Sequence, residues 1–101
     1  MKDGQALEKR IENDLRIRRT AKSGAHWNNA DLSDNRVTIE AKAKSVSTFR
    51  TAKGEIKKVQ EQADKAGKDW VYIQETDGQT YALMDYQFFR ELWDSWQQTD
   101  H

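Results

Sequence analysis

Two charged side chains stand two residues apart in a segment whose residue types alternate as in a β-strand. Across residues 36–42 this alternation places Glu40 and Lys42 on one face, about 6–7 Å apart. If residues 30–33 form a preceding strand that turns at Asp34-Asn35, Asp31 lies close to Glu40. Two neighbouring carboxylates favour a hard divalent cation, Mg²⁺ or Mn²⁺, between them. With a lysine to orient a water or neutralise charge at phosphorus, these residues predict metal-assisted phosphodiester hydrolysis.

A third carboxylate, Glu8, lies in a helix that we expect over Gly4–Arg19. The apolar residues of this helix recur every four positions and are Leu7, Ile11 and Leu15. Glu8 borders that stripe, so it can complete the site from the first helix. Glu12, one turn later, is the rival for the same role, and an ordinary surface glutamate paired with Arg16 is the alternative reading of Glu8.

Charge is divided unevenly along the 101 residues, although the net charge is zero. Residues 1–60 hold 14 basic and 8 acidic residues, a net of +6, while residues 61–101 hold 3 and 9, a net of −6. This split favours a polyanion such as DNA as partner of the basic part. We expect phosphate contacts, rather than a merely soluble surface, from some of Arg16, Arg18, Arg19, Lys22, Lys44, Arg50, Lys53, Lys57 and Lys58.

The segment Thr20–Asn29 has no periodicity and predicts a loop that carries a histidine and a tryptophan. His26 has an imidazole suited to general-base catalysis near neutral pH, although a solvated loop histidine is more typical. Trp27 can stack on an unpaired base or pack partly onto the domain. Both residues are candidates for DNA contacts.

The remaining elements follow in regular order and position these residues. We expect strands over Ala30–Ser33 and Arg36–Lys42, a helix over Ala52–Ala66, strands over Trp70–Glu75 and Gln79–Met84, and a helix over Tyr86–Gln97. Gly67 is the expected helix C-cap, Asp77-Gly78 a hairpin turn and Asp85 a helix N-cap. The order α-β-β-α-β-β-α predicts an α/β (α+β) fold, a mixed β-sheet flanked by helices, in one domain over residues 1–101.

The last expected helix carries more large apolar side chains than one narrow stripe can bury. These are Phe88, Phe89, Leu92, Trp93 and Trp96. Exposed aromatics of this kind mark an association surface, so we expect a homodimer through this helix. A helix packed into a groove and covered on both sides is the alternative.

Several classes of protein are excluded or disfavoured. The chain has no cysteine, which rules out disulfides, thiolate zinc sites and a cysteine nucleophile. It has no long apolar stretch, and its first residues are charged, so we expect a soluble cytoplasmic protein of a bacterial or phage-infected cell, with no membrane partner. No Walker-type loop occurs, so ATP use is not predicted.

The residues Asp31 and Glu40-Ala41-Lys42, with eight residues between Asp31 and Glu40, resemble the motif of the PD-(D/E)XK nuclease superfamily. The element order, the Gly4 to Glu8 start of the first helix and the Ser23-Gly24-Ala25 segment are similar to its archaeal-type and phage Holliday junction resolvases. Ala30 stands where the motif has its proline, and the spacer between the two acidic residues is shorter than in many members.

The resemblance implies a restriction-endonuclease-like fold and a metal-dependent endonuclease that makes paired nicks in four-way DNA junctions. It implies metal binding by Asp31 and Glu40, a catalytic role for Lys42, a metal-side role for Glu8, and a position near the scissile phosphate for Ser23. Two alternatives are another nicking or structure-specific nuclease of this superfamily and a non-catalytic DNA-binding module with the same fold.

Overall fold

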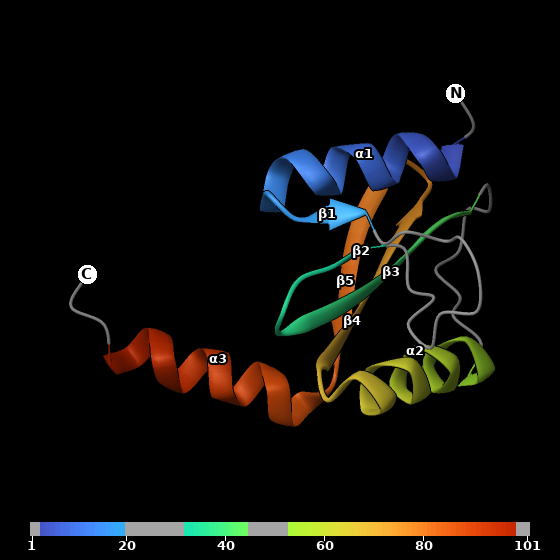
Figure 1. The fold of residues 1–101 in the computed structure, drawn as a ribbon. Coiled ribbons are helices and arrows are strands. Elements are labelled where there is room, and N and C mark those ends of the chain that lie inside the picture. Colours follow the sequence, from blue (N-terminus) through green and yellow to red (C-terminus); the bar gives the residue numbers. More distant parts are fainter. Residues whose placement is uncertain (1–2, 20–31, 45–52, 99–101) are drawn as a thin grey trace.

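The computed structural model describes residues 3–19, 32–44 and 53–98 (Figure 1). Its elements are α1 (Asp3–Leu15), β1 (Arg18–Arg19), β2 (Leu32–Ser33), β3 (Val37–Lys44), α2 (Lys53–Ala66), β4 (Asp69–Thr76), β5 (Gln79–Met84) and α3 (Tyr86–Gln98). Within these ranges, no helix combines the length and the apolar character that crossing a membrane requires.

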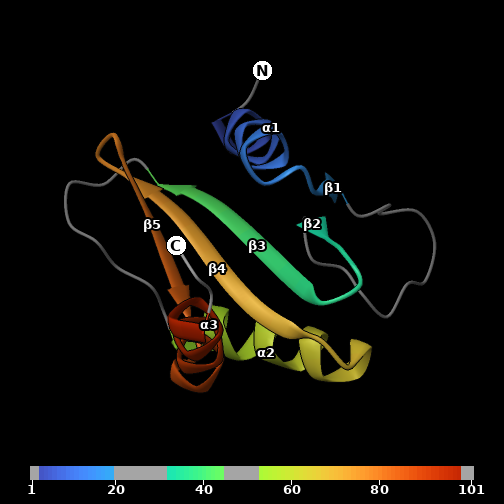
Figure 2. The ribbon, with the colours of Figure 1, turned by 90° about the vertical axis from the view of Figure 1, so that its left-hand side faces the viewer.

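The strands form one mixed sheet in the order β1-β2-β3-β4-β5. All neighbours are antiparallel except β3 and β4, which run parallel and are joined through α2. Helices α1 and α2 lie on opposite sides of this sheet (Figure 2). The predicted mixed sheet flanked by helices is therefore confirmed, with one short strand, β1, added at its edge.

The first helix ends four residues earlier than expected. It stops at Leu15 because Arg16 adopts a left-handed conformation with φ of 56°, and the Ile17 amide donates to the Glu12 carbonyl at 3.2 Å. This hydrogen bond is typical of a Schellman C-cap. In that motif the left-handed residue, here Arg16, is usually a glycine. The predicted helix to Arg19 is wrong here, because no glycine marks the turn and Ile17 returns the chain to the core, where it is 7% exposed.

Strand alternation divides the interior into two layers, as the sequence predicts. On the α1 side, Ile39 and Ala41 of β3 pack with Val71 and Ile73 of β4. On the α2 side, the core is made by Val59, Ala63, Trp70 and Tyr72. The intervening β3 positions, Glu40 and Lys42, therefore face the α2 side of the sheet.

The β2–β3 hairpin turns where the sequence predicts it, at Asp34. One carboxylate oxygen of Asp34 accepts from the amides of Arg36 at 2.8 Å and Val37 at 2.7 Å. Partial burial raises the pKa of Asp34, but these two hydrogen bonds and the charges of Lys68 and Arg36 outweigh it, so the pKa is lowered. The turn thus sets the antiparallel register in which Leu32 lies opposite Ile39.

The other predicted turn and helix-cap residues are also confirmed. Gly67 has φ of 66° and its amide donates to the Asp64 carbonyl, which closes the C-terminus of α2. Asp77 and Gly78 both have positive φ, as a type I′ hairpin turn requires. The Asp85 carboxylate accepts from the Gln87 amide at 3.0 Å and caps the N-terminus of α3.

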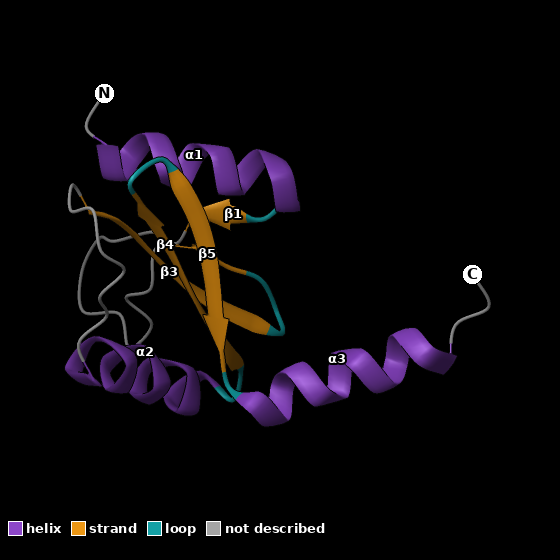
Figure 3. Cartoon of the chain, turned by 180° about the vertical axis from the view of Figure 1, so that it is seen from behind, coloured by secondary structure: helices purple, strands orange, loops and turns teal. Residues whose placement is uncertain are grey.

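Helix α3 leaves the sheet and projects away from the rest of the chain (Figure 3). Phe88 is the single residue of α3 that is buried, at 7% exposed. Exposed apolar side chains of this helix are Tyr86, Phe89, Leu92, Trp93 and Trp96. The expectation of surplus aromatic residues is confirmed, and the alternative of a helix covered on both sides is not what the structure has.

Candidate active site

The candidate site lies on β3, the central strand of the sheet, where Glu40 and Lys42 face α2. Glu40 is half-buried and Lys42 is exposed. Both line a hollow of about 100 Å³ between β3, β4 and α2. The other residues that line it are Glu55, Lys58, Val59 and Tyr72. The predicted pairing of Glu40 with Lys42 on one face is therefore what the fold provides.

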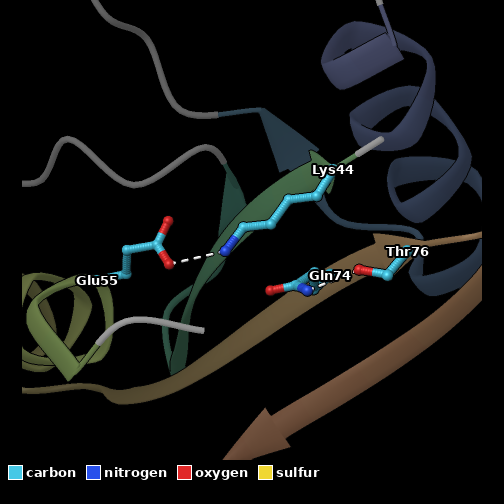
Figure 4. A network of polar contacts seen from close by, with 4 residues as sticks. All are labelled: Lys44, Glu55, Gln74 and Thr76. Atoms are coloured by element: carbon cyan, nitrogen blue, oxygen red, sulfur yellow. Dashed lines mark hydrogen bonds and ion pairs between the residues drawn. The ribbon is translucent and has the colours of Figure 1, made fainter. Parts of the chain in front are cut away.

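The parallel neighbour β4 supplies a row of polar side chains beside the two charged ones. The register sets Glu40 against Tyr72 and Lys42 against Gln74. Gln74 is fully buried, and its side-chain amide donates to the Thr76 hydroxyl at 2.7 Å (Figure 4). Buried polar groups need hydrogen-bond partners, so this pairing stabilises a polar layer under the site without exposing it to water.

Helix α2 contributes an ion pair at the end of the same strand. The Lys44 ammonium donates to the Glu55 carboxylate at 2.9 Å, and the two side chains are 23% and 29% exposed (Figure 4). Glu55 is the third residue of α2, so this contact ties the first turn of the helix to β3. Partial burial gives such a pair more weight than an ordinary surface ion pair.

Tyr72 carries the strongest electrostatic perturbation described. Its side chain is 1% exposed, and its hydroxyl has no hydrogen-bond partner among the described residues. Burial, then the charge and polar contact of Glu55, then the charge of Glu40 raise the pKa of Tyr72 well above its ordinary value. The phenol therefore stays protonated at neutral pH and can donate a hydrogen bond into the site.

Replacing Tyr72 by phenylalanine should remove one source of instability in alkali. With the pKa of Tyr72 raised in the folded protein, the unfolded chain loses the phenol proton first, so stability is full below about pH 10 and falls above it. Urea unfolding at about pH 8 and about pH 11, followed by circular dichroism, should reveal a smaller loss in Tyr72→Phe than in the unaltered protein. Tyr86→Phe, at a side chain 75% exposed, is the control. Equal losses in all three proteins would contradict this origin of the instability.

The remaining predicted site residues lie away from this hollow or outside the described part of the chain. Glu8 is half-buried on α1, which packs against the opposite face of the sheet, and it does not line the hollow. Arg18 and Arg19 form β1, and Lys53 begins α2. Within the ranges that the structure describes, no three acidic or histidine side chains converge as a metal centre. Outside the described residues lie Lys22, Ser23, His26, Trp27, Asp31 and Arg50.

Sequence reasoning missed Glu55, Tyr72 and Gln74 as parts of the site. Tyr72 and Gln74 had a signal, because alternation along β4 puts them on the face that Glu40 occupies on β3. Glu55 stands three and four residues before Lys58 and Val59, so its side of α2 could be deduced from the helix period. These residues come together because β3 and β4 are adjacent and parallel. The sequence pattern alone does not predict that pairing.

Comparisons with known proteins agree with this architecture. No protein-family model matches the chain, and no curated protein matches it in sequence. Among solved structures, it is similar to Hjc from Archaeoglobus fulgidus, a Holliday junction resolvase from an archaeal hyperthermophile. The TM-score is 0.60 with 15% sequence identity, over 80% of this chain and 76% of the resolvase chain. The chain thus has the fold of a Holliday junction resolvase, in agreement with the predicted fold class.

Proposed function

We propose that this protein is a metal-dependent endonuclease that resolves four-way DNA junctions by paired nicks. The observation that carries the proposal is the position of Glu40 and Lys42, which share a hollow on the central strand of a fold that a Holliday junction resolvase also has. Fold alone supports many activities, so the weight rests on these two side chains. Phosphodiester hydrolysis needs both kinds of group, a carboxylate for a metal and a cation for developing charge.

The donor chemistry of the site fits a hard divalent cation. Glu40 offers a half-buried carboxylate, and its negative charge contributes to the raised pKa of the neighbouring Tyr72 phenol. Asp31 lies outside the described residues and is the second carboxylate that the sequence predicts for this site. Asp31 and Glu40 would hold Mg²⁺ or Mn²⁺, which when bound supplies Lewis-acid stabilisation of the phosphate and a more acidic water.

The lysines of the site have two separate roles in this proposal. Lys42 lies on the same strand face as Glu40, where its ammonium orients the attacking water or neutralises charge on the phosphorane oxygens. Lys58 lines the same hollow, and Lys53 and Lys57 are exposed on α2. These α2 lysines give the surface beside the site the positive charge that a DNA backbone requires.

The proposed assembly is a homodimer formed through α3. A four-way junction has near-twofold symmetry, so two symmetric nicks call for two sites related by a twofold axis. Aromatic rings of α3 lie against one another in tilted pairs along one side of the helix, with ring centroids 6.1 Å apart for Phe89 and Trp93 and 5.4 Å apart for Trp93 and Trp96. A second copy of the same helix would cover this row and remove it from water.

A cleavage assay on defined DNA shapes tests the proposed function. The purified protein is incubated with a labelled four-way junction, a linear duplex and a single strand of the same sequence, with Mg²⁺ and with EDTA. We expect symmetric, metal-dependent nicks in the junction alone. Cleavage of all three substrates would replace junction resolution by general nuclease activity. Binding without cleavage would overturn the proposal in favour of a DNA-binding module with this fold.

A further inference from the structure

Glu55 belongs to the same hollow as Glu40 and Lys42 but comes from a different element, the first turn of α2. Its carboxylate binds the Lys44 ammonium at 2.9 Å. Lys44 stands two residues beyond Lys42 on β3, so one contact connects the strand that carries the catalytic groups with the helix that forms the opposite wall.

The charge balance of the hollow depends on Glu55. Two carboxylates and two ammonium groups line it, and the Lys44 ammonium adds a third positive charge at the edge. With Glu55 neutralised, three ammonium groups would remain around Glu40 alone. Their positive charges would then act on Glu40, because no second carboxylate would take up the charge of Lys44.

Tyr72 also lines the hollow, from the neighbouring strand β4. Its hydroxyl is buried and has no hydrogen-bond partner within the part of the chain that the structure describes. A buried hydroxyl without a partner is unfavourable, so the Tyr72 phenol favours an acceptor among the side chains that line the hollow. Glu55 is one of the two carboxylates that line it.

We propose that Glu55 is a positioning residue of the nuclease site, acting through Lys44. It fixes the first turn of α2 against β3 and takes up the charge of Lys44, so that Glu40 and Lys42 keep their relative places in the hollow. The inference rests on the proposed nuclease function and deepens it, because it assigns the α2 wall a part in setting the turnover rate.

A double-mutant cycle on kcat and KM for junction cleavage tests this role. Glu55→Gln and Lys44→Met should each lower kcat about 10-fold with little change in KM, and the double variant should be no worse than either single one, because both break the same contact. Glu61→Gln and Lys65→Met, at exposed positions of α2, are the matched controls. Circular dichroism and urea unfolding verify that each variant is folded.

The outcomes separate three situations. If Glu55→Gln raises the Mg²⁺ concentration for half-maximal rate at least about 10-fold while Lys44→Met does not, Glu55 is a metal ligand and the positioning role is overturned. If the two effects on kcat multiply, or if Glu55→Gln has the activity of the unaltered protein, the inference is wrong while the proposed function stands. An unaltered protein that cleaves no DNA overturns both.

Discussion

Replacing Glu40 by glutamine should lower the rate of junction cleavage by at least about 100-fold while junction binding persists or tightens. Glutamine has the volume of glutamate, so the hollow beside Lys42 and Tyr72 keeps its shape. What disappears is one negative charge that would hold a divalent cation, and with it a charge that repels phosphate. Single-turnover cleavage of a labelled junction, with a gel-shift titration in Ca²⁺ or EDTA for binding, is the measurement.

Lys42 provides the second half of this prediction. Lys42→Gln should also lose at least about 100-fold in rate, since a neutral amide replaces the group that neutralises charge at phosphorus. Its response to metal should differ from that of Glu40→Gln, because higher Mg²⁺ or Mn²⁺ can partly restore a weakened metal site but cannot replace the ammonium. Glu61→Gln and Lys65→Gln, on the exposed side of α2, should cleave as the unaltered protein does.

Either of two results would remove the site from the proposal. Cleavage by Glu40→Gln at the rate of the unaltered protein would mean that the hollow on β3 is not where hydrolysis occurs. A loss of binding equal to the loss of cleavage in both variants would assign Glu40 and Lys42 to DNA contact or folding instead of catalysis. The unfolding midpoints of the variants distinguish DNA contact from folding, because a lowered midpoint indicates a folding defect.

Short-range signals were sufficient to predict the parts of the fold that position the site. Glycine at position 67 and aspartate at positions 34 and 85 each act within a few residues, so their turns and caps follow from residue type. The end of α1 could not be predicted in the same way. At Arg16 the left-handed conformation is adopted by a residue that does not favour it, because burial of Ile17 in the core compensates for the local cost.

The part of the site on β3 could be predicted from the sequence, whereas the residues that α2 and β4 contribute could not. Glu40 and Lys42 follow from alternation along β3, whereas Glu55 and Tyr72 join them only because α2 crosses back over the sheet and β4 pairs with β3 in parallel. The same limit applies to Glu8. Its place beside the apolar stripe of α1 is right, but which face of the sheet α1 covers cannot be read from that stripe.

Helix α3 is where the second large effect is expected, because Trp93 lies in the middle of its aromatic row. Trp93→Glu should convert the proposed dimer to a monomer, raising the dissociation constant by at least about 100-fold. The change acts twice in a twofold interface, and each copy exchanges a large apolar contact for a charge that must leave water. Trp93 is 50% exposed in the single chain, so the monomer fold should be retained. Sedimentation velocity over a range of concentrations measures the constant.

Gln98→Glu is the matched control for this change, because it adds the same charge to the same helix at an exposed position about 140° from Trp93. It should leave the dimer intact. A concentration-independent monomer for the unaltered protein would exclude the α3 dimer, and an unchanged dimer in Trp93→Glu would move the interface elsewhere.

Loss of the dimer should also uncouple the two nicks. A supercoiled plasmid with an extruded cruciform is linearised when both strands are cut before the junction is lost, and is only relaxed when one strand is cut. Trp93→Glu should therefore shift the product from linear to nicked circles while each site still hydrolyses its strand, because Glu40 and Lys42 lie on β3 and outside α3. Linear product in the same proportion as with the unaltered protein would mean that paired cutting does not depend on α3.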